Sequence, residues 1–293
     1  MLLYFNGDSF ASGVELADDM LPGYPGSFTW PVDYASDPVA KKGKEWLDNS
    51  HEGSHPSSKT RKSMTHELTQ TELARAYPNL VHNMTGLPFI NKSQGGSSMD
   101  RIVRVTIADL IRLKKEVPDR KLVAFICTTY IERSEIPNNL PPIEDMHGDP
   151  QYWASISTTF RQSDHDEMIE SIRKYKVLYE KPYHSMLNFY KNVVLLQDYC
   201  KLNSVDLHWI SGGENIHTMM NYLHHENSIA DIFKNDLVAL MEYAKMQVTL
   251  SMQDIAEHEL RGELVMCVGR HFAQPVHDRI AEKIVDILGT VSR

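Results

Sequence analysis

The residue best placed to do chemistry in this sequence is a serine in a turn bounded by glycines. The apolar run Leu2–Phe5 stops at Gly7, Asp8 and Ser9, and Gly13 follows shortly afterwards. A serine hydroxyl becomes a useful nucleophile only when a fixed turn presents it to a base and to hydrogen-bond donors for the oxyanion. The pattern therefore predicts a nucleophilic Ser9 at a strand end, although an ordinary capped turn between a strand and a helix uses the same residue types.

Two distant segments contain the other groups that such a serine requires. The polar run Asn91–Ile102 includes Gly96, and the run Gly269–Ala281 includes His271 and His277. Together with the first turn, these segments resemble the conserved blocks of the SGNH, or GDSL-type, hydrolases. Proteins of this family also occur in phage genomes, and the sequence is compatible with such a source.

The resemblance implies a role for each matching residue. Ser9 aligns with the nucleophile, and His271, rather than His277, aligns with the family's catalytic histidine. The backbone N–H groups of Ser9 and Gly96 align with the oxyanion donors. The implied activity is hydrolysis of a small acyl ester through an acyl-enzyme on Ser9, and a carbohydrate O-acetyl group is the substrate that the family suggests. Lipase and thioesterase activities stay open, and no cofactor is implied.

The sequence departs from the family pattern at two positions. Val268 stands three residues before His271, where the family has an aspartate, and Cys127-Thr128-Thr129-Tyr130 replaces the block that normally supplies an asparagine donor. The hydroxyl of Thr128 or Thr129 can substitute as an oxyanion donor, and a carboxylate elsewhere in the chain can orient the histidine. Serine and histidine can also work as a dyad, because the third member mainly fixes the tautomer and stabilises the imidazolium.

These departures support an alternative, a non-catalytic protein of the same fold with a structural or glycan-binding role. The joint presence of Ser9, Gly96 and His271 favours the enzyme. A thiol nucleophile is a second alternative, since Cys127 and Cys267 follow or end predicted strands. Neither cysteine has a glycine-bounded turn, and cysteine is also a common buried residue.

Apolar runs that alternate with helical patterns predict an α/β fold with a parallel sheet. The predicted strands are Leu2–Phe5, Val81–His82, Phe89–Ile90, Leu122–Cys127, Asp206–Ile210 and Leu264–Cys267. The predicted helices run from a cap at Ser97 or Ser98 to before Pro118, from about Asp166 to Lys201 with a break near Pro182, and from about Val276 to Leu288. The family resemblance implies a three-layer αβα, flavodoxin-like fold with five parallel strands.

In such a fold, ligands bind outside the carboxyl ends of the strands. Ser9, Gly96, Thr128, Thr129 and His271 all follow or end predicted strands, so we expect them at one edge of the sheet. Beyond Thr129, Arg133 and Glu135 are expected to pair with each other or to contact a substrate, with a structural role favoured for Arg133 and likewise for Arg101 in the second block.

The composition fits one globular domain over residues 1–293, with 42% hydrophobic residues. Two stretches rich in turn-forming residues, at about 19–64 and 132–165, are predicted to be irregular insertions. Aromatic residues in the first of them, such as Trp30, either cover a substrate or simply hold the loop against the protein. The net charge of −9 argues against a nucleic-acid partner.

No metal centre or membrane segment is expected. The clusters of histidine and acidic residues at 164–167, 224–225 and 257–259 lack the spacing of metal ligands. No apolar run has the length of a membrane span, and the first block begins too close to Met1 to leave room for a signal peptide. The sequence thus predicts a protein made in a cytoplasm, with release by lysis or association with a virion left open. Its oligomeric state is left open as well.

Overall fold

The computed structural model describes most of the chain in two compact units. The described residues are 1–30, 41–42, 45–46, 63–137, 143–144, 147, 150–151, 153–156, 174, 182–212, 231–267 and 271–291. The first unit contains Met1–Asp8 and Ile90–Thr249, and the second contains Ser9–Phe89 and Leu250–Arg293. Most of the two predicted insertions, at 19–64 and 132–165, lies outside the described residues.

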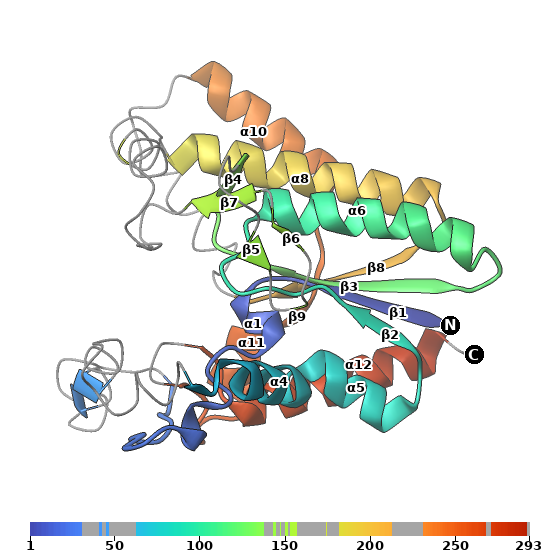
Figure 1. The fold of residues 1–293 in the computed structure, drawn as a ribbon. Helices are drawn as coiled ribbons and strands as arrows, with labels where there is room; N and C mark the ends of the chain where they lie inside the picture. The colour runs from blue at the N-terminus through green and yellow to red at the C-terminus, as the bar shows by residue number, and fades with distance from the viewer. Residues whose placement is uncertain are drawn as a thin grey trace. The chain divides into compact units, whose positions relative to one another are not determined.

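A five-stranded sheet is the framework of the fold (Figure 1). Its strands, in spatial order, are β2 (Phe89–Asn91), β1 (Leu2–Asn6), β3 (Leu122–Thr128), β8 (Asp206–Ser211) and β9 (Val248–Ser251). Strand β1 pairs in parallel with β3, and β3 pairs in parallel with β8. Numbered by position in the chain, the order is 2-1-3-4-5, which is the flavodoxin-like order. The predicted α/β class and five-stranded parallel sheet are confirmed.

Strands β1 and β3 are buried along their entire lengths. Strands covered on both faces read as continuous apolar runs, which is why Leu2–Phe5 and Leu122–Cys127 could be recognised in the sequence. The register aligns Leu2 with Leu122 and Asn6 with Ile126. The side chain of Asn6, at the end of β1, donates hydrogen bonds to the Ile102 carbonyl at 3.1 Å and to the Thr106 hydroxyl at 3.0 Å.

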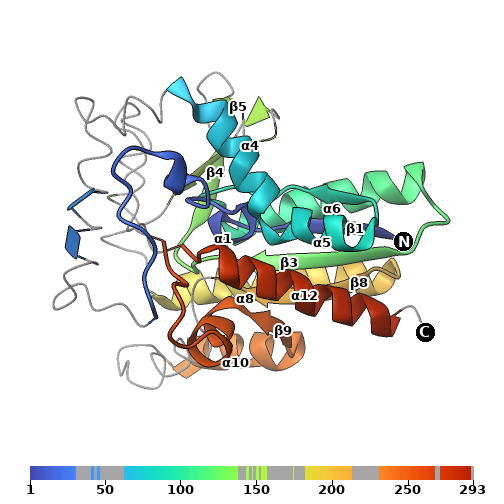
Figure 2. The ribbon, with the colours of Figure 1, turned by 90° about the horizontal axis from the view of Figure 1, so that it is seen from below.

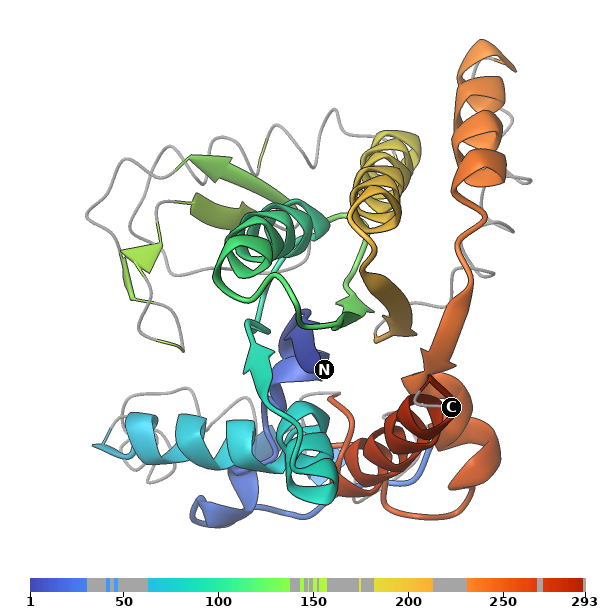
Figure 3. The same ribbon diagram turned by 90° about the vertical axis from the view of Figure 1, so that its right-hand side faces the viewer.

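The first unit contains three long helices, and the second of them along the chain packs against both of the others (Figure 3). They are α6 (Met99–Glu116), α8 (Pro182–Leu202) and α10 (Asp231–Ala244). Helix α6 begins after Ser98, whose hydroxyl accepts a hydrogen bond from the Arg101 N–H at 3.2 Å, and it ends before Pro118 as predicted. Helix α8 packs against α6 and begins at Pro182, because proline is tolerated in the first turn of a helix.

The described parts of the 132–165 region form short antiparallel pairs rather than an entirely irregular loop. Strand β4 (Ser134–Pro137) pairs with β7 (Trp153–Ile156), and β5 (Ile143–Glu144) pairs with β6 (Pro150–Gln151).

The second unit is mainly helical, and its helices α5 and α12 pack together in Figure 2. Its elements are α1 (Ser9–Ser12), η1 (Asp18–Met20), α4 (Thr65–Arg75), α5 (Tyr77–Thr85), α11 (Met252–Asp254), η2 (Ile255–Glu259) and α12 (Gln274–Val291). Helix α12 confirms the predicted final helix and extends it at both ends.

Two predicted strands are wrong. Val81–His82 lies inside α5, because Pro78 suits the first turn of a helix and Gly86, with a φ of 67°, ends it in the left-handed conformation. Leu264–Cys267 is not a sheet strand, since only Met266 forms isolated bridges, with Phe28 and with Phe272. The fifth strand is instead β9, which is short and partly exposed and so carries a weak apolar pattern.

None of the helices in the described part of the chain combines the length and the apolar composition needed to span a membrane.

The contrast between two adjacent residues of α6 tests the packing of the first unit. Leu110 is fully buried, whereas Ile111 is 44% exposed. We expect Leu110→Ala to lower the free energy of unfolding by about 2–5 kcal/mol, because it leaves a cavity in the core. The matched Ile111→Ala should cost much less. Denaturant unfolding of both variants checks the assignment, which equal losses would contradict.

Candidate active site

The turn that follows Ser9 is closed by short-range hydrogen bonds in the second unit. The Val14 N–H donates to the Ser9 carbonyl at 3.2 Å, and the Leu16 N–H donates to the Gly13 carbonyl at 3.0 Å. Gly13 has a φ of +75°, and a Cβ at this position would lie 2.7 Å from the carbonyl oxygen of Glu72. Only glycine fits both the left-handed backbone and the close approach of the neighbouring chain.

This turn places a carboxylate beside the candidate catalytic histidine. Oε1 of Glu15 lies 3.0 Å from Nδ1 of His271, with side-chain exposures of 10% and 20%. Glu15 has a φ of 74°, which is uncommon for a residue other than glycine. Its N–H donates to Oε1 of Glu72 at 2.8 Å, so a second buried carboxylate holds this conformation in place.

His271 is positioned by its backbone and by a neighbouring ring. Its carbonyl accepts a hydrogen bond from the Cys267 N–H at 2.7 Å. Its imidazole lies against Phe10, the residue after Ser9, with ring centroids 5.4 Å apart. The second unit thus brings the segment of Ser9, a histidine and a carboxylate together.

His277 has a different environment, which separates it from His271. It is buried, and its Nδ1 accepts a hydrogen bond from the Tyr77 N–H at 3.3 Å. Burial, together with the nearby His271, lowers the pKa of His277 to about 3. A neutral, buried histidine that bonds to backbone is a packing residue, in line with the selection of His271 from the sequence.

The two cysteines considered as nucleophiles are buried free thiols. Burial raises the pKa of Cys267 well above its usual value, and the negative charges of Glu15 and Asp18 raise it further. The thiol of Cys127 points to the carbonyl of Thr128 at 3.7 Å. Because the thiolate is the reactive form, these surroundings disfavour a thiol nucleophile.

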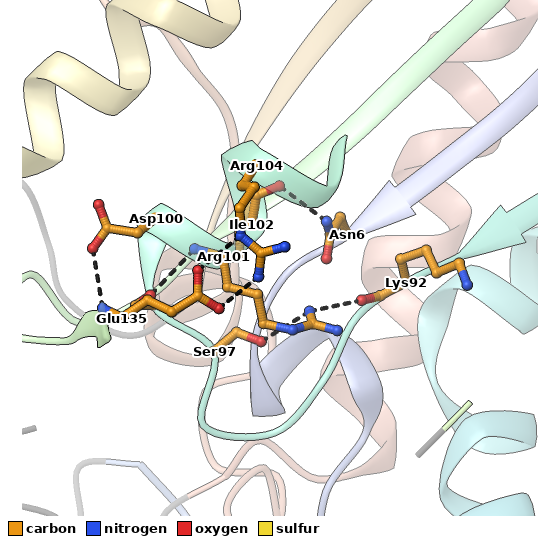
Figure 4. Close-up of polar contacts among 9 residues, drawn as sticks. Asn6, Lys92, Ser97, Asp100, Arg101, Ile102, Arg104 and Glu135 are labelled. Carbon is orange, nitrogen blue, oxygen red and sulfur yellow. Dashed lines mark hydrogen bonds and ion pairs between the residues drawn. The ribbon is translucent and has the colours of Figure 1, made fainter. Parts of the chain in front are cut away.

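In the first unit, a buried ion pair lies at the carboxyl ends of β1 and β3. Asp8 is fully buried, and its Oδ2 lies 3.0 Å from Nη1 of Arg133. The same oxygen accepts a hydrogen bond from the Thr129 hydroxyl at 2.7 Å. Arg133 therefore pairs with Asp8 and not with Glu135, which instead makes a two-pronged ion pair with Arg104 at 2.7 and 3.0 Å (Figure 4).

The loop of the second block is bonded to the end of β1. The Lys92 N–H donates to the Phe5 carbonyl at 2.8 Å, and the Gln94 N–H donates to the Gly7 carbonyl at 3.0 Å. Arg101 has the structural role expected for it, because its Nη1 donates to the Lys92 carbonyl and to the Ser97 hydroxyl, each at 3.2 Å (Figure 4).

Gly96, in the same loop, has a φ of +77°, and no atom of the described residues lies within 4 Å of the place where a Cβ would be. The left-handed conformation explains the glycine, and the space beside it lets another group approach the backbone.

The described aromatic residues of the first insertion are held by the protein itself. Nε1 of Trp30 donates to Oε1 of Glu257 at 2.7 Å, and its ring lies 6.5 Å from that of Phe272. Tyr24 and Trp46 pack edge to face. These contacts fit the interpretation in which the aromatic residues fix the loop.

Some predicted features lie outside the described residues. Val268 and the clusters at 164–167 and 224–225 are among them. Among the residues that the structure does describe, no group of three or more His, Cys, Asp or Glu side chains is arranged to hold a metal ion. Neither the contact of Glu15 with His271 nor the ion pair between Asp8 and Arg133 was predicted from the sequence. Both contacts join distant segments, and no local sequence pattern indicates them.

The depressed pKa of His277 generates a pH-dependent prediction. Its pKa is about 3 in the folded protein and near 6.5 when exposed, so below pH 6.5 the unfolded state binds the extra proton. Stability should therefore fall as the pH falls, by up to about 1.4 kcal/mol per pH unit from this residue. His277→Asn keeps an acceptor for the Tyr77 N–H. Between about pH 5.5 and 4, the free energy of unfolding of this variant should therefore fall less steeply with falling pH than that of the wild type. Parallel stability curves for the two proteins in denaturant titrations would contradict the assignment.

The close approach at Gly13 generates a second prediction. Gly13→Ala should lower the free energy of unfolding by more than about 1 kcal/mol, because it adds a Cβ at positive φ and against the Glu72 carbonyl. Gly262→Ala is the control, since Gly262 has a φ of +90° but no atom in the described part of the chain within 4 Å of an added Cβ. Thermal unfolding should show the larger loss at Gly13, and equal losses would show that the close contact is unimportant.

No protein family and no curated protein matches this chain. Among solved structures, the chain is similar to a member of the lipolytic protein G-D-S-L family from Veillonella parvula DSM 2008, with 10% identity, a TM-score of 0.39, and coverage of 98% of this chain and 97% of that one. It is also similar to a carbohydrate esterase whose active site is described as displaying divergent catalytic and non-catalytic binding functions. In that case the identity is 12%, the TM-score is 0.41, and the coverage is 98% of this chain and 68% of the other.

Proposed function

We propose that this protein is a serine esterase that hydrolyses a small acyl ester through an acyl-enzyme on Ser9. The observation that carries the proposal is the Glu15 carboxylate 3.0 Å from Nδ1 of His271, in the unit that also contains Ser9. A largely buried carboxylate beside a partly exposed histidine is the arrangement that a general base requires.

Glu15 takes the role that the family's aspartate has at the position of Val268. A carboxylate at Nδ1 favours the tautomer with a proton on that nitrogen, which leaves the lone pair of Nε2 to accept the serine proton. It also stabilises the positive charge that His271 gains in the transition state. Both effects depend on where the carboxylate lies, and neither depends on where it occurs in the chain.

The reaction has two steps. Ser9 Oγ attacks the acyl carbonyl carbon while His271 Nε2 takes the hydroxyl proton, and collapse of the tetrahedral intermediate releases the alcohol with that proton. Water then attacks the acyl-enzyme with His271 as the base, the acid leaves, and Ser9 regains its proton.

The proposed oxyanion donors are the N–H groups of Ser9 and Gly96. Among the described residues, none fills the space beside Gly96, which supports this role because a substrate oxygen must approach the backbone closely. The Thr129 hydroxyl already donates its proton to Asp8. We therefore propose Thr128, rather than Thr129, as the hydroxyl donor.

The rings around His271 support a short, uncharged acyl group. Phe10 lies 5.4 Å from His271 and 5.7 Å from Phe272, which in turn contacts Trp30. An acetyl group presents one methyl to such apolar surroundings. The proposed substrate class is an O-acetylated carbohydrate, which is the substrate that the family resemblance implies and which carries an acyl group of this size.

Substitution of the three proposed catalytic residues tests the function. We expect Ser9→Ala and His271→Ala to abolish labelling by a fluorophosphonate probe and turnover of a small acetyl ester. Glu15→Gln keeps the shape of the side chain but removes its charge, so kcat should fall by about 10³–10⁴-fold, as when a triad carboxylate becomes an amide.

Asp19→Asn is the matched control, because Asp19 forms an exposed ion pair with Arg75. It should leave both labelling and turnover unchanged. A folded wild-type protein that neither reacts with the probe nor hydrolyses acetyl esters would overturn the proposed function.

A further inference from the structure

Arg133 connects three segments that are far apart in the sequence but belong to the same unit. Its Nη1 lies 3.0 Å from the carboxylate of Asp8, and it donates hydrogen bonds to the Thr129 hydroxyl at 2.9 Å and to the Ser97 carbonyl at 3.5 Å. The guanidinium is 9% exposed and lies over the ring of Tyr130, 4.9 Å from its centroid. Polar partners thus bind the edge of the planar guanidinium, and the Tyr130 ring packs against its face.

The three polar contacts of the Arg133 guanidinium fall on neighbours of the proposed oxyanion donors. Asp8 precedes Ser9, Ser97 follows Gly96, and Thr129 follows Thr128. We infer that Arg133 is a positioning residue that holds the loop of Gly96 and the end of β3 with Thr128 in place against Asp8, all within the first unit. This inference rests on the proposed function for its catalytic consequence.

The contacts of Ser97 show how tightly the second-block loop is held. Arg133 bonds to its carbonyl, while Arg101 donates to its hydroxyl. Preorganised donors stabilise an oxyanion only when they are already in place, and a displacement of about 1 Å can cost about 10²-fold in rate. Because Asp8 and Ser97 are covalently linked to Ser9 and Gly96, we expect loss of Arg133 to loosen the backbone that carries these N–H groups.

A double substitution separates positioning from simple stabilisation. Arg133→Met alone leaves Asp8 as a buried charge without its cation, and this variant can fail to fold. Asp8→Asn combined with Arg133→Met removes both charges, and the new amide can still accept the bond from the Thr129 hydroxyl. This double variant should fold with thermal stability close to that of the wild type.

We expect the double variant to hydrolyse an acetyl ester with kcat lowered about 10–10²-fold and with KM little changed, because displaced donors affect the transition state more than the ground state. Lys121→Met is the control. It breaks a half-exposed ion pair with Asp206 at the amino ends of β3 and β8, and it should leave kcat unchanged. A stable double variant with wild-type kcat would overturn the inference.

Hydrogen exchange followed by mass spectrometry gives a readout that does not depend on activity. Exchange should become faster in peptides containing Ser9 and Gly96 of the double variant, but not in peptides from α10. Unchanged exchange at Ser9 and Gly96 would overturn the positioning role whether or not the wild type hydrolyses an ester. Faster exchange in a protein with no esterase activity would support the positioning role and overturn only the proposed function.

Discussion

Parallel pairing between two completely buried strands, β1 and β3, is the constraint on which the polar network at their carboxyl ends depends. Burial on both faces demands continuous apolar runs, and the register that joins Asn6 to Ile126 brings the two carboxyl ends to one level. The chain must then leave both strands at adjacent points. Asp8 and Thr129, the residues that follow, are consequently within hydrogen-bond distance of each other.

The polar groups at these strand ends are buried, and their pairing makes the site rigid. An unpaired charge at the position of Asp8 would be very costly, so the Arg133 guanidinium and the Thr129 hydroxyl both serve this carboxylate. A similar arrangement joins α6 to α8, where Asp100 accepts hydrogen bonds from Asn188 and Asn192. Networks of this kind permit few alternative geometries.

The pair formed by Glu15 and His271 shows how a carboxylate can reach an imidazole from a distant segment of the chain. The electrostatic effect of a carboxylate on an imidazole depends on distance and burial. Here the carboxylate comes from the turn after Ser9. Gly13 allows that turn to pass close to Glu72, whose side chain in turn holds the Glu15 backbone at positive φ. The backbone strain at Glu15 is thus balanced by local hydrogen bonds.

The sequence by itself determined the α/β class, the central strands, α6 and α12, because apolar periodicity reports directly on burial. Its local motifs also led to the prediction of Ser9 and His271 as site residues, which stays a prediction. Only the tertiary structure decided that Val81–His82 is helical, that β9 completes the sheet, and which partners Glu15 and Arg133 have. Periodicity records which faces of an element are buried, whereas a contact between distant side chains depends on turn geometry and strand register, which leave no local pattern.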